Sequence, residues 1–526
     1  MIYNSQFLIV GPCIIGLLRQ GAVYSDNLCI IDTEKVIFNL YRLMWSHRVQ
    51  SSQFLYQQVI DVINDMISQQ VLKPGDKLPS LRKLAQQLSV SIPTVKQAYY
   101  HLEGQGRIYS KEKSGYFLFD GEQNTLPRRC KLPINPTQVN KQSLIEQVYE
   151  GIHAPHEAKF GIANPVTAMG DEAILAKMMR SALKQAGEQL LQYGAMDGLL
   201  KLKQQIVQRY LHMGLSVVAD DIVITNGAQE ALAIALQCVT QPGDVVAIES
   251  PGYFGIIELI ENLGLQAIEI PVCPDDGLWL EDLAHALTKH DVKACVCSTS
   301  INNPIGSFMP DSRRQSLLQM LVENNVTLIE DDVYGDLYFT KYRGKPAQYY
   351  AQPGQVITCD SFSKTAAPSY RVGWMLAPGH AARARRYKRA LSCSSSLINQ
   401  WVLAEYLASG AYDRHLKKLR LRLQENKQKM LACIRSAFPI ETRISDPRGG
   451  CVVWLELDAS IDGGTLFNMA MAQGISLTPG QLFSASERFQ NCIRLSYGLP
   501  WQDKHEASLK RLGELVQVLS DKKRGP

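Results

Sequence analysis

The sequence predicts a chain of two folded domains: a small, mainly helical domain followed by a large α/β domain built on a mostly parallel sheet. Three observations support this prediction. At 526 residues the chain is too long for one ordinary hydrophobic core. Helical periodicity and a strong turn occupy residues 54–119, whereas short apolar runs alternate with helical patterns beyond about residue 160. The composition, 46% apolar and 20% charged, is typical of a globular protein rather than a disordered one.

Residues 1–43 show no clear period and belong to no motif. Their apolar stretch, residues 7–18, is too short to span a bilayer and lacks the basic segment that begins a signal peptide. Met44 stands about ten residues before the first convincing helix. We therefore expect residues 1–43 to be an over-extended reading frame with Met44 as the true start; the alternative is a genuine accessory arm.

Cysteine usage indicates a reducing compartment. The 12 cysteines are scattered, with no C-x-x-C pair and no His/Cys cluster of the kind that binds metal. Cys295 and Cys297 alternate with Val296 in an apolar run and are expected on a strand. We predict reduced thiols, no metal site and a cytoplasmic location.

The first domain is predicted from two capped helices. A preceding amphipathic helix has its apolar face at Leu55, Val59, Val62, Ile63 and Met66, and residues 73–76 form a turn. Ser80 can cap a short helix whose apolar side is Leu81, Leu84, Ala85 and Leu88. After a turn at Ser89-Val90, Ser91 can cap the next helix, which tolerates Pro93 in its first turn, ends near residues 104–106, and buries Val95, Ala98, Tyr99 and Leu102.

Two short strands, residues 107–110 and 116–119, flank a basic tip at residues 111–115. Residues 45–119 contain 9 Lys and Arg against 5 Asp and Glu, so this segment holds most of the net charge of +5. Two helices joined by a tight turn and followed by a wing predict a winged helix-turn-helix that exposes Ser91, Thr94, Lys96 and Gln97. A small helical domain without a nucleic-acid role is the alternative.

Residues 54–119 resemble the GntR family of regulators. The matching residues are Leu78-Pro79-Ser80, Arg82, Leu84-Ala85, Val90-Ser91, Thr94-Val95, Tyr99, Leu102, Gly106 and Gly115-Tyr116. The resemblance implies double-stranded operator DNA as a partner, contacted by Ser80, Arg82, Ser91, Thr94 and Lys96, with Gly115 at the tip of the wing. Ile92 departs from the pattern, because the family usually carries Arg there. An Arg at this position could bind guanine, so the departure bears on the operator sequence rather than on DNA binding itself.

Residues 120–145 are polar, aperiodic and dotted with proline, which predicts a stiffened linker. We place the first domain at 44–119, the linker at 120–154 and the large domain at 155–522. Within the large domain, residues from about 185 to 390 form the larger part, and the remaining ends form a smaller one.

Six apolar runs of the large domain have the length of buried strands: 222–225, 245–249, 267–271, 294–298, 326–330 and 356–359. Ligands of such folds bind at the carboxyl ends of the strands. There the chain places residues 226–229 at the start of a helix, then Asp331, then Ser361 and Lys364. Each alone has an ordinary explanation as a turn, a capping carboxylate or a solvated lysine. Together they supply the phosphate site, the carboxylate and the lysine that pyridoxal phosphate requires.

Residues 155–520 closely resemble the fold-type-I aminotransferases. The motifs match in order and spacing: Tyr193-x-x-x-x-Gly198, Gly227-Ala228-Gln229, Ser250-Pro251-Gly252-Tyr253, Asn303-Pro304-x-Gly306, Glu330-Asp331-Asp332-x-Tyr334, Ser361-Phe362-Ser363-Lys364, Arg371-x-Gly373, Gly449-Gly450 and Ile493-Arg494-Leu495-Ser496. The resemblance implies pyridoxal 5'-phosphate as cofactor, with Lys364 as its catalytic, Schiff-base lysine.

The same resemblance implies a role for each of the other motif residues. Asp331 would pair with the pyridine nitrogen, Asn303 and Tyr334 with the ring oxygen, and Tyr253 would stack on the ring. Arg494 would bind the carboxylate of an amino acid. The phosphate would be held by Ala228, Gln229, Ser361, Ser363, Arg371 and, across a homodimer interface, Tyr193.

A winged helix followed by such a domain resembles the MocR subfamily of GntR regulators. This implies a homodimer, head-to-tail, in which an amine or amino-acid effector displaces Lys364 by aldimine exchange and changes DNA binding. We expect closure around Arg494, transmitted through residues 120–145, to couple the two events. Two alternatives remain: a functional aminotransferase with a DNA-binding appendage, and a DNA-binding protein whose cofactor site is a relic.

Overall fold

The computed structural model divides the chain into two compact units, Met1–Gln123 and Asn124–Pro526. The residues it describes are 22–25, 28–31, 55–68, 71–73, 75–104, 107–111, 114–118, 126–128, 134–139, 145–146, 148–150, 156–340 and 342–524. None of the helices in these ranges is long and apolar enough to cross a membrane.

Near the N-terminus, β1 (Ala22–Ser25) and β2 (Leu28–Ile31) pair as an antiparallel hairpin. The other residues up to 54, Met44 among them, lie outside the described residues. The two interpretations of residues 1–43 therefore remain predictions.

The first unit folds around the helices expected from the sequence: α3 (Leu55–Ser68), α4 (Leu81–Leu88) and α5 (Ile92–Gly104). Their predicted apolar faces form one core together with β3 (Ile108–Lys111) and β4 (Gly115–Leu118). The two strands pair antiparallel. Strand β3 begins one residue later than predicted, and β4 begins one residue earlier. One expectation is wrong: Leu55 is 49% exposed, because it begins α3 and lies beyond the core that Val59 starts.

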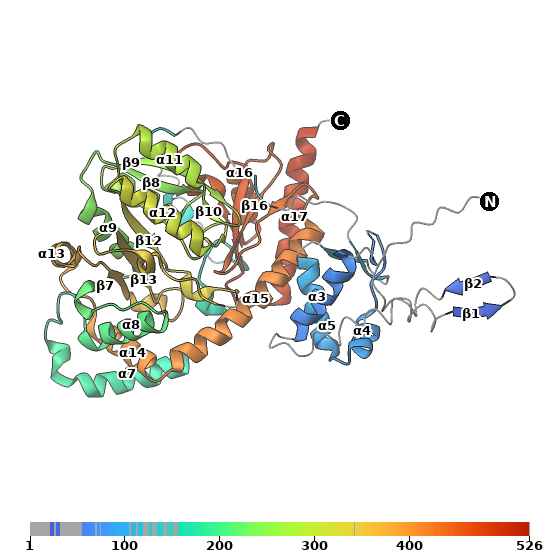
Figure 1. Cartoon of the computed structure of the whole chain (residues 1–526), viewed down its shortest axis with the longest axis horizontal. Helices are drawn as coiled ribbons and strands as arrows, with labels where there is room; N and C mark the ends of the chain where they lie inside the picture. Colours follow the sequence, from blue (N-terminus) through green and yellow to red (C-terminus); the bar gives the residue numbers. More distant parts are fainter. Residues whose placement is uncertain are drawn as a thin grey trace. The chain divides into compact units, whose positions relative to one another are not determined.

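The second unit contains a sheet in the order β10-β9-β8-β11-β12-β13-β14-β7, with β5 also paired to β9 (Figure 1). The strands are β5 (Thr137–Gln138), β7 (Ile222–Thr225), β8 (Val245–Ser250), β9 (Gln266–Cys273), β10 (Gly277–Leu278), β11 (Val292–Cys297), β12 (Thr327–Asp331), β13 (Val356–Ser361) and β14 (Gly373–Leu376). Strands β9, β8, β11, β12 and β13 are parallel to their neighbours in this order. Because β14 is antiparallel to both β13 and β7, β7 points the same way as β13. All six strands predicted from apolar runs are present.

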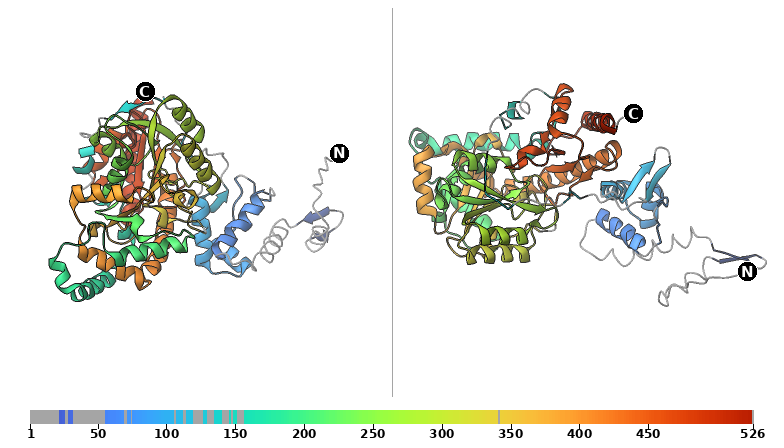
Figure 2. Two further views of the ribbon diagram at one scale, coloured as in Figure 1. Left: turned by 60° about the vertical axis from the view of Figure 1, so that its left-hand side comes forward. Right: turned by 90° about the horizontal axis from the view of Figure 1, so that it is seen from above.

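Both faces of this sheet are buried, which explains why its strands read as continuous apolar runs. Alternate residues face two different clusters; on β7, for example, Ile222 and Ile224 join one cluster and Val223 the other. The helices of this part are α8 (Leu200–His212), α9 (Ala228–Val239), α10 (Phe254–Asn262), α11 (Leu280–Lys289), α12 (Asp311–Glu323), α13 (Ala381–Ser392) and α14 (Leu397–Ala408). Figure 2 shows helices on both sides of the sheet.

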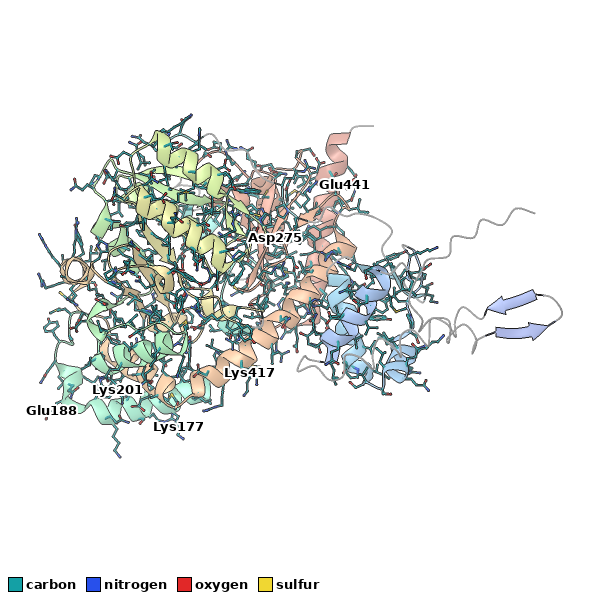
Figure 3. All side chains as sticks on the ribbon, viewed as in Figure 1. Lys177, Glu188, Lys201, Asp275, Lys417 and Glu441 are labelled. Carbon is teal, nitrogen blue, oxygen red and sulfur yellow. The ribbon has the colours of Figure 1, made fainter. Side chains whose placement is uncertain are left out.

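The C-terminal residues form a second, smaller sheet. Its order is β15 (Arg443–Ile444), β16 (Val452–Glu456), β19 (Cys492–Ser496) and β18 (Thr478–Pro479). The long helix α15 (Ala411–Ala437) packs against α17 (Asp503–Arg524) and α16 (Gly463–Ala472) also packs against α17. A parallel pair joins β6 (Ala158–Lys159) to β17 (Ile475–Ser476). Helix α7 (Glu172–Ala186) packs on α14, and Lys177 projects outward from it in Figure 3.

The predicted linker differs from what its described residues show. Thr137 and Gln138 add a strand to the edge of β9. Val139, Ile145 and Val148 are buried in the core of the second unit. The many polar residues of the predicted linker, residues 120–154, conceal these three apolar residues. At least these parts of the segment are therefore structured on the second unit.

Candidate functional site

The connection from α4 to α5 is fixed by two serine caps. The Ser80 hydroxyl accepts the backbone N–H of Lys83 at 3.2 Å and begins α4. The Ser91 hydroxyl accepts the backbone N–H of Thr94 at 3.2 Å and lies 2.7 Å from the Thr94 hydroxyl. Such caps satisfy helix N–H groups that have no carbonyl partner. Ser89 makes the turn between them with φ 54°, in the left-handed region.

The predicted DNA-binding residues lie on or beside these two helices and the wing. Five of them are exposed and Thr94 is half-buried; the exposed ones are Ser80, Arg82, Ser91, Lys96 and Gly115. Ile92 is 44% exposed at the first position of α5, a large apolar side chain directed to solvent. Gly115 begins β4 with φ 101°, which favours glycine at this position. The cationic and hydroxyl side chains at these positions are suited to phosphate and base contacts.

The second candidate site is a cleft of about 340 Å³ in the second unit. It lies where β7, β8, β11, β12 and β13 end, because the carboxyl ends of these strands meet at one edge of the sheet. All predicted cofactor and effector residues except Tyr193 line this cleft: Ala228, Gln229, Tyr253, Asn303, Asp331, Tyr334, Ser361, Ser363, Lys364, Arg371 and Arg494. Tyr193 is 90% exposed and is not among the lining residues.

One end of the cleft is built to hold an anion. The first turn of α9 opens onto it, and backbone N–H groups of a first helical turn have no partner within the helix. Arg371 donates from Nη2 to the carbonyl of Asn226 at 3.1 Å and from Nη1 to the Ser363 hydroxyl at 3.4 Å. The Ser361 hydroxyl donates to that of Ser363 at 2.7 Å. Two hydroxyls, a guanidinium and free amides therefore converge on one end of the cleft.

Two glycines allow this close approach. Gly227 has φ 84°, and a Cβ there would lie 2.5 Å from Nη2 of Arg371. A Cβ on Gly373 would lie 2.6 Å from the backbone carbon of Gly227 and 2.9 Å from the amide nitrogen of Ala228. Larger residues at either position would displace the arginine or the start of α9. The space matches what a phosphate group needs beside backbone N–H groups.

Lys364 follows β13 and reaches into the middle of the cleft. Its Nζ donates to the carbonyl of Ala163 at 2.8 Å. Burial lowers the pKa of Lys364, because a charged amine is poorly solvated there. Asp331, at the end of β12, accepts the N–H of Val333 at 3.2 Å, and burial raises the pKa of Asp331 to about 6. The cleft is therefore lined by an amine that loses its proton more readily than usual and by a carboxylate whose charge a cationic partner would stabilise.

Arg494 lies at another wall of the cleft and is only 3% exposed. Its Nη2 donates to the carbonyl of Gly161 at 2.8 Å and to the hydroxyl of Thr478 at 2.9 Å, and its Nη1 donates to Asn303 Oδ1 at 3.4 Å. Its Nε has no hydrogen-bond partner among the described residues. Burial lowers the pKa of Arg494, and the main interactions that oppose this shift come from Tyr334, Cys451, Tyr253 and Tyr149 rather than from a carboxylate. The guanidinium is therefore a buried cation held by neutral groups.

Sequence reasoning missed several residues of this cleft. Tyr149 belongs to the segment predicted as linker, and Gly161 and Ala163 supply carbonyls to Arg494 and Lys364. Cys451 lies 3.5 Å from the hydroxyl of Tyr334, which was expected to bind the cofactor ring. Backbone carbonyls carry no residue signature. Only the motif Gly449-Gly450 pointed to the loop before Cys451.

Comparisons with known proteins agree with both parts of the chain. Residues 55–118 match the bacterial regulatory proteins of the gntR family, and residues 157–507 match the aminotransferases of class I and II. The chain is 34% identical over 463 residues to the uncharacterized HTH-type transcriptional regulator YdcR of Escherichia coli K12, covering 88% of this chain and 99% of that protein. A second Escherichia coli regulator, YjiR, is 32% identical over 469 residues, covering 88% and 98% respectively.

Among solved structures, the kynurenine aminotransferase of Pyrococcus horikoshii matches with a TM-score of 0.67 at 26% identity, covering 72% of this chain and 94% of that one. The α-aminoadipate aminotransferase LysN of Thermus thermophilus matches with a TM-score of 0.66 at 27% identity, covering 72% and 95%. The aminotransferase class implies dependence on pyridoxal phosphate. With a GntR helix-turn-helix domain joined to a class I and II aminotransferase domain, the chain belongs to the MocR-type regulators of the GntR family.

Proposed function

We propose that this chain is a transcription regulator that binds operator DNA through its first unit and senses a carboxylate-bearing amine, such as an amino acid, in the cleft of its second unit. The observation that carries the proposal is the buried cation of Arg494, which lies in the same cleft as Lys364 and has no carboxylate partner among the described residues. A buried charge without a counterion is costly. The carboxylate of a ligand would supply the missing counterion, with the bidentate geometry that a guanidinium favours.

The cleft also fits pyridoxal phosphate. Arg371, Ser361, Ser363 and the first turn of α9 would hold the phosphate, and Asp331 would keep the pyridine nitrogen protonated. Bound pyridoxal phosphate supplies an aldehyde with which an amine can condense. Lys364 is suited to condense with this aldehyde, because its lowered pKa makes it a better nucleophile at neutral pH. Tyr253 would pack on the ring, and Asn303 and Tyr334 would donate to its oxygen.

The ligand site and the DNA site must be linked for the chain to regulate. Binding alone shifts no equilibrium; the ligand has to prefer one arrangement of the protein over another. We infer that closure of the cleft around Arg494 supplies this preference. Residues 120–145 would carry the effect to the first unit. The DNA-binding residues themselves, Ser80, Arg82, Ser91, Thr94, Lys96 and Gly115, need not change.

A homodimer, arranged head-to-tail, is part of this proposal, as is a cytoplasmic location. Tyr193 is 90% exposed, Leu191 89% and Leu200 58%, an unusual concentration of exposed apolar side chains within ten residues. A partner subunit covering them would bring Tyr193 to the phosphate end of its cleft. Sedimentation of the native chain and of Tyr193→Ala tests this. A monomeric native chain at micromolar concentration would contradict the dimer.

The function is tested by footprinting the purified protein on the intergenic DNA beside its own gene. The experiment compares pyridoxal phosphate alone with pyridoxal phosphate plus a pool of amino acids. We expect protection of two repeated half-sites that changes with the pool, since a dimer carries two DNA-binding units and each contacts one half-site. If the pool forms adducts with the cofactor but leaves both footprint and affinity unchanged, the sensing proposal is wrong.

A second candidate function is amino-group transfer. The intact set of Lys364, Asp331 and Arg494 favours it, because these side chains suit a transaminase as well as a sensor. Amino-group transfer to a keto acid at ordinary enzymatic rates, with no DNA protection under any condition, would favour this candidate. Protein that never takes up pyridoxal phosphate would instead favour a relic site.

A further inference from the structure

The segment that leads from the first unit into the second follows a defined path on the second unit. The Leu126 carbonyl accepts Arg443 Nη1 at 3.2 Å, and the Arg128 N–H donates to Glu456 Oε2 at 2.9 Å. Farther along, the Ile134 carbonyl lies 3.1 Å from His290 Nε2. Residues 137–138 then pair with β9. The described parts of this segment, residues 126–128, 134–139 and 145–150 without 147, are hereafter called the tether.

The tether ends in the wall of the ligand cleft. Ile145 and Val148 are buried, each 3% exposed, and Tyr149 lines the cleft together with Arg494. The Tyr149 ring meets the Phe254 ring edge-on, with centroids 5.8 Å apart. Burial raises the pKa of Tyr149, the charge of Glu258, which does not line the cleft, raises it further, and the charge of Arg494 acts in the opposite direction. Tyr149 is therefore part of the ligand site although it belongs to the tether.

A series of ring contacts joins Tyr149 to the cation that would bind a carboxylate. Phe254 meets Phe483 edge-on at 5.7 Å, and the Arg494 guanidinium lies 5.2 Å above the Phe483 ring. Aromatic pairs of this kind are stabilising and geometrically specific. Tyr149, Phe254 and Arg494 also line the same cleft, so a ligand held by Arg494 would share that cleft with the rings of Phe254 and Tyr149.

The charges of the cleft limit which side chain the ligand can carry. The described lining contains four charged residues: Asp331, Lys364, Arg371 and Arg494. In the proposed function Asp331, Arg371 and Arg494 pair with the pyridine nitrogen, the phosphate and the ligand carboxylate. The ligand amine would displace Lys364, and burial lowers the pKa of that lysine, which disfavours its charged form. None of the four therefore remains as a ready partner for a charge on the ligand side chain. The other lining residues include Ile162, Phe254 and Ile301, which offer apolar surface.

We propose that the effector is an amino acid with an uncharged, apolar or aromatic side chain, and that Tyr149 contacts this side chain and thereby couples ligand binding to the tether. The proposal rests on the proposed function and adds to it the ligand class and the residue of the tether that senses the ligand. The coupling is reciprocal. If ligand binding favours the conformation in which the tether packs on the second unit, that conformation raises the affinity for the ligand by the same factor. Tyr149 would be the residue through which ligand binding changes the stability of the tether conformation.

The test uses the full-length chain loaded with pyridoxal phosphate. L-leucine, L-phenylalanine, L-glutamate and L-lysine are titrated while the absorbance of the bound cofactor is followed. DNA affinity is measured in parallel by fluorescence anisotropy, with and without saturating amino acid. Three variants are compared with the native chain: Tyr149→Ala, Tyr149→Phe, and Tyr342→Ala as a matched control. Tyr342 is 70% exposed and does not line the cleft.

We expect L-leucine or L-phenylalanine to bind the native chain more tightly than L-glutamate and L-lysine. Tyr149→Ala should weaken that binding about tenfold, as the loss of one aromatic contact predicts, and abolish the DNA response even at saturating ligand. Tyr149→Phe, which keeps the ring, and the control should behave like the native chain.

Preference for a charged amino acid would overturn the ligand class. A Tyr149→Ala variant that keeps native affinity, or responds to saturating ligand as the native chain does, would overturn the coupling role. Failure of the proposed function would give a different result, because it would be seen in the native chain without any substitution. In that case no amino acid changes its DNA affinity.

Discussion

Replacing Arg494 by methionine separates a ligand-binding role from a structural one. In the native chain Arg494 makes two short hydrogen bonds, to Gly161 and Thr478, and one long one to Asn303. Hydrogen bonds to a charged group are worth about 1.5–3 kcal/mol each, so their loss costs several kcal/mol. The methionine variant, however, no longer has to take an unpaired charge out of water on folding, which stabilises it by an amount of similar size. The free energy of unfolding should therefore change by about 2 kcal/mol or less.

The same substitution should have a much larger effect on an amino-acid ligand. Loss of one partner of a buried, hydrogen-bonded charge pair costs about 2–5 kcal/mol, so the dissociation constant should rise at least about 30-fold. Urea unfolding measures the first quantity, and titration of the pyridoxal-phosphate-loaded chain with L-leucine measures the second. Isopentylamine, which is L-leucine without its carboxylate, should bind the native chain and Arg494→Met equally well.

Either of two results would refute this reasoning. Destabilisation by about 4 kcal/mol or more with unchanged L-leucine affinity would mean that Arg494 is a structural residue, since its hydrogen bonds, at about 1.5–3 kcal/mol each, would then be lost without any compensating gain. An equal loss of affinity for L-leucine and for isopentylamine would mean that the cleft had collapsed. Arg494→Lys, which keeps the charge without the bidentate geometry, should give an intermediate affinity for L-leucine.

Three further predictions follow from single residues. Ile92→Arg should raise the preference for guanine at one position per half-site by about 1–3 kcal/mol, because arginine can donate two hydrogen bonds to guanine and isoleucine can donate none. Selection from a randomised DNA pool measures this, and an unchanged consensus contradicts it. Burial raises the pKa of Asp331 from 3.8 to about 6, so without cofactor its contribution to stability is present below about pH 4 and lost as the pH rises through about 6. The native chain should lose about 2–3 kcal/mol more than Asp331→Asn over that range in urea unfolding at successive pH values, and parallel curves would exclude this assignment. Gly227→Ala, with φ 84° and a Cβ 2.5 Å from Nη2 of Arg371, should weaken pyridoxal phosphate binding in equilibrium dialysis, whereas Gly243→Ala, at φ 95° with open space around its Cβ, should not.

The features predicted well from the sequence are those with local signatures. Ser80 and Ser91 each stand immediately before a run with helical period, and both cap their helices. The buried strands appear as apolar runs because residues such as Val223 and Ile224 face two different cores. Polar motifs at the ends of those runs then converge, because parallel strands place their carboxyl ends at one edge.

Features that depend on distant partners were missed. Strand β14 (Gly373–Leu376) is short and antiparallel, and it is held between β13 and β7 rather than by its own pattern. The sequence predicts a stiffened linker in place of the tether, because polar residues outnumber Val139, Ile145 and Val148 there. Tyr149 shows why such an error matters for function: its role comes from lying beside Phe254, more than a hundred positions away in sequence.

The buried cations of the chain support a ligand at Arg494. Among the described residues, four Lys and Arg residues are at most 3% exposed: Lys203, Arg314, Lys388 and Arg494. The first three have carboxylate partners, Asp197 at 2.7 Å, Asp311 at 3.2 Å and Glu230 at 2.9 Å respectively. Arg494 has only neutral acceptors and an Nε without a partner, although it lies in the cleft that also holds Lys364 and Asp331. A fold that pairs the other three cations of this set with carboxylates and leaves Arg494 with neutral acceptors has the charge pattern expected of a site completed by an anionic ligand.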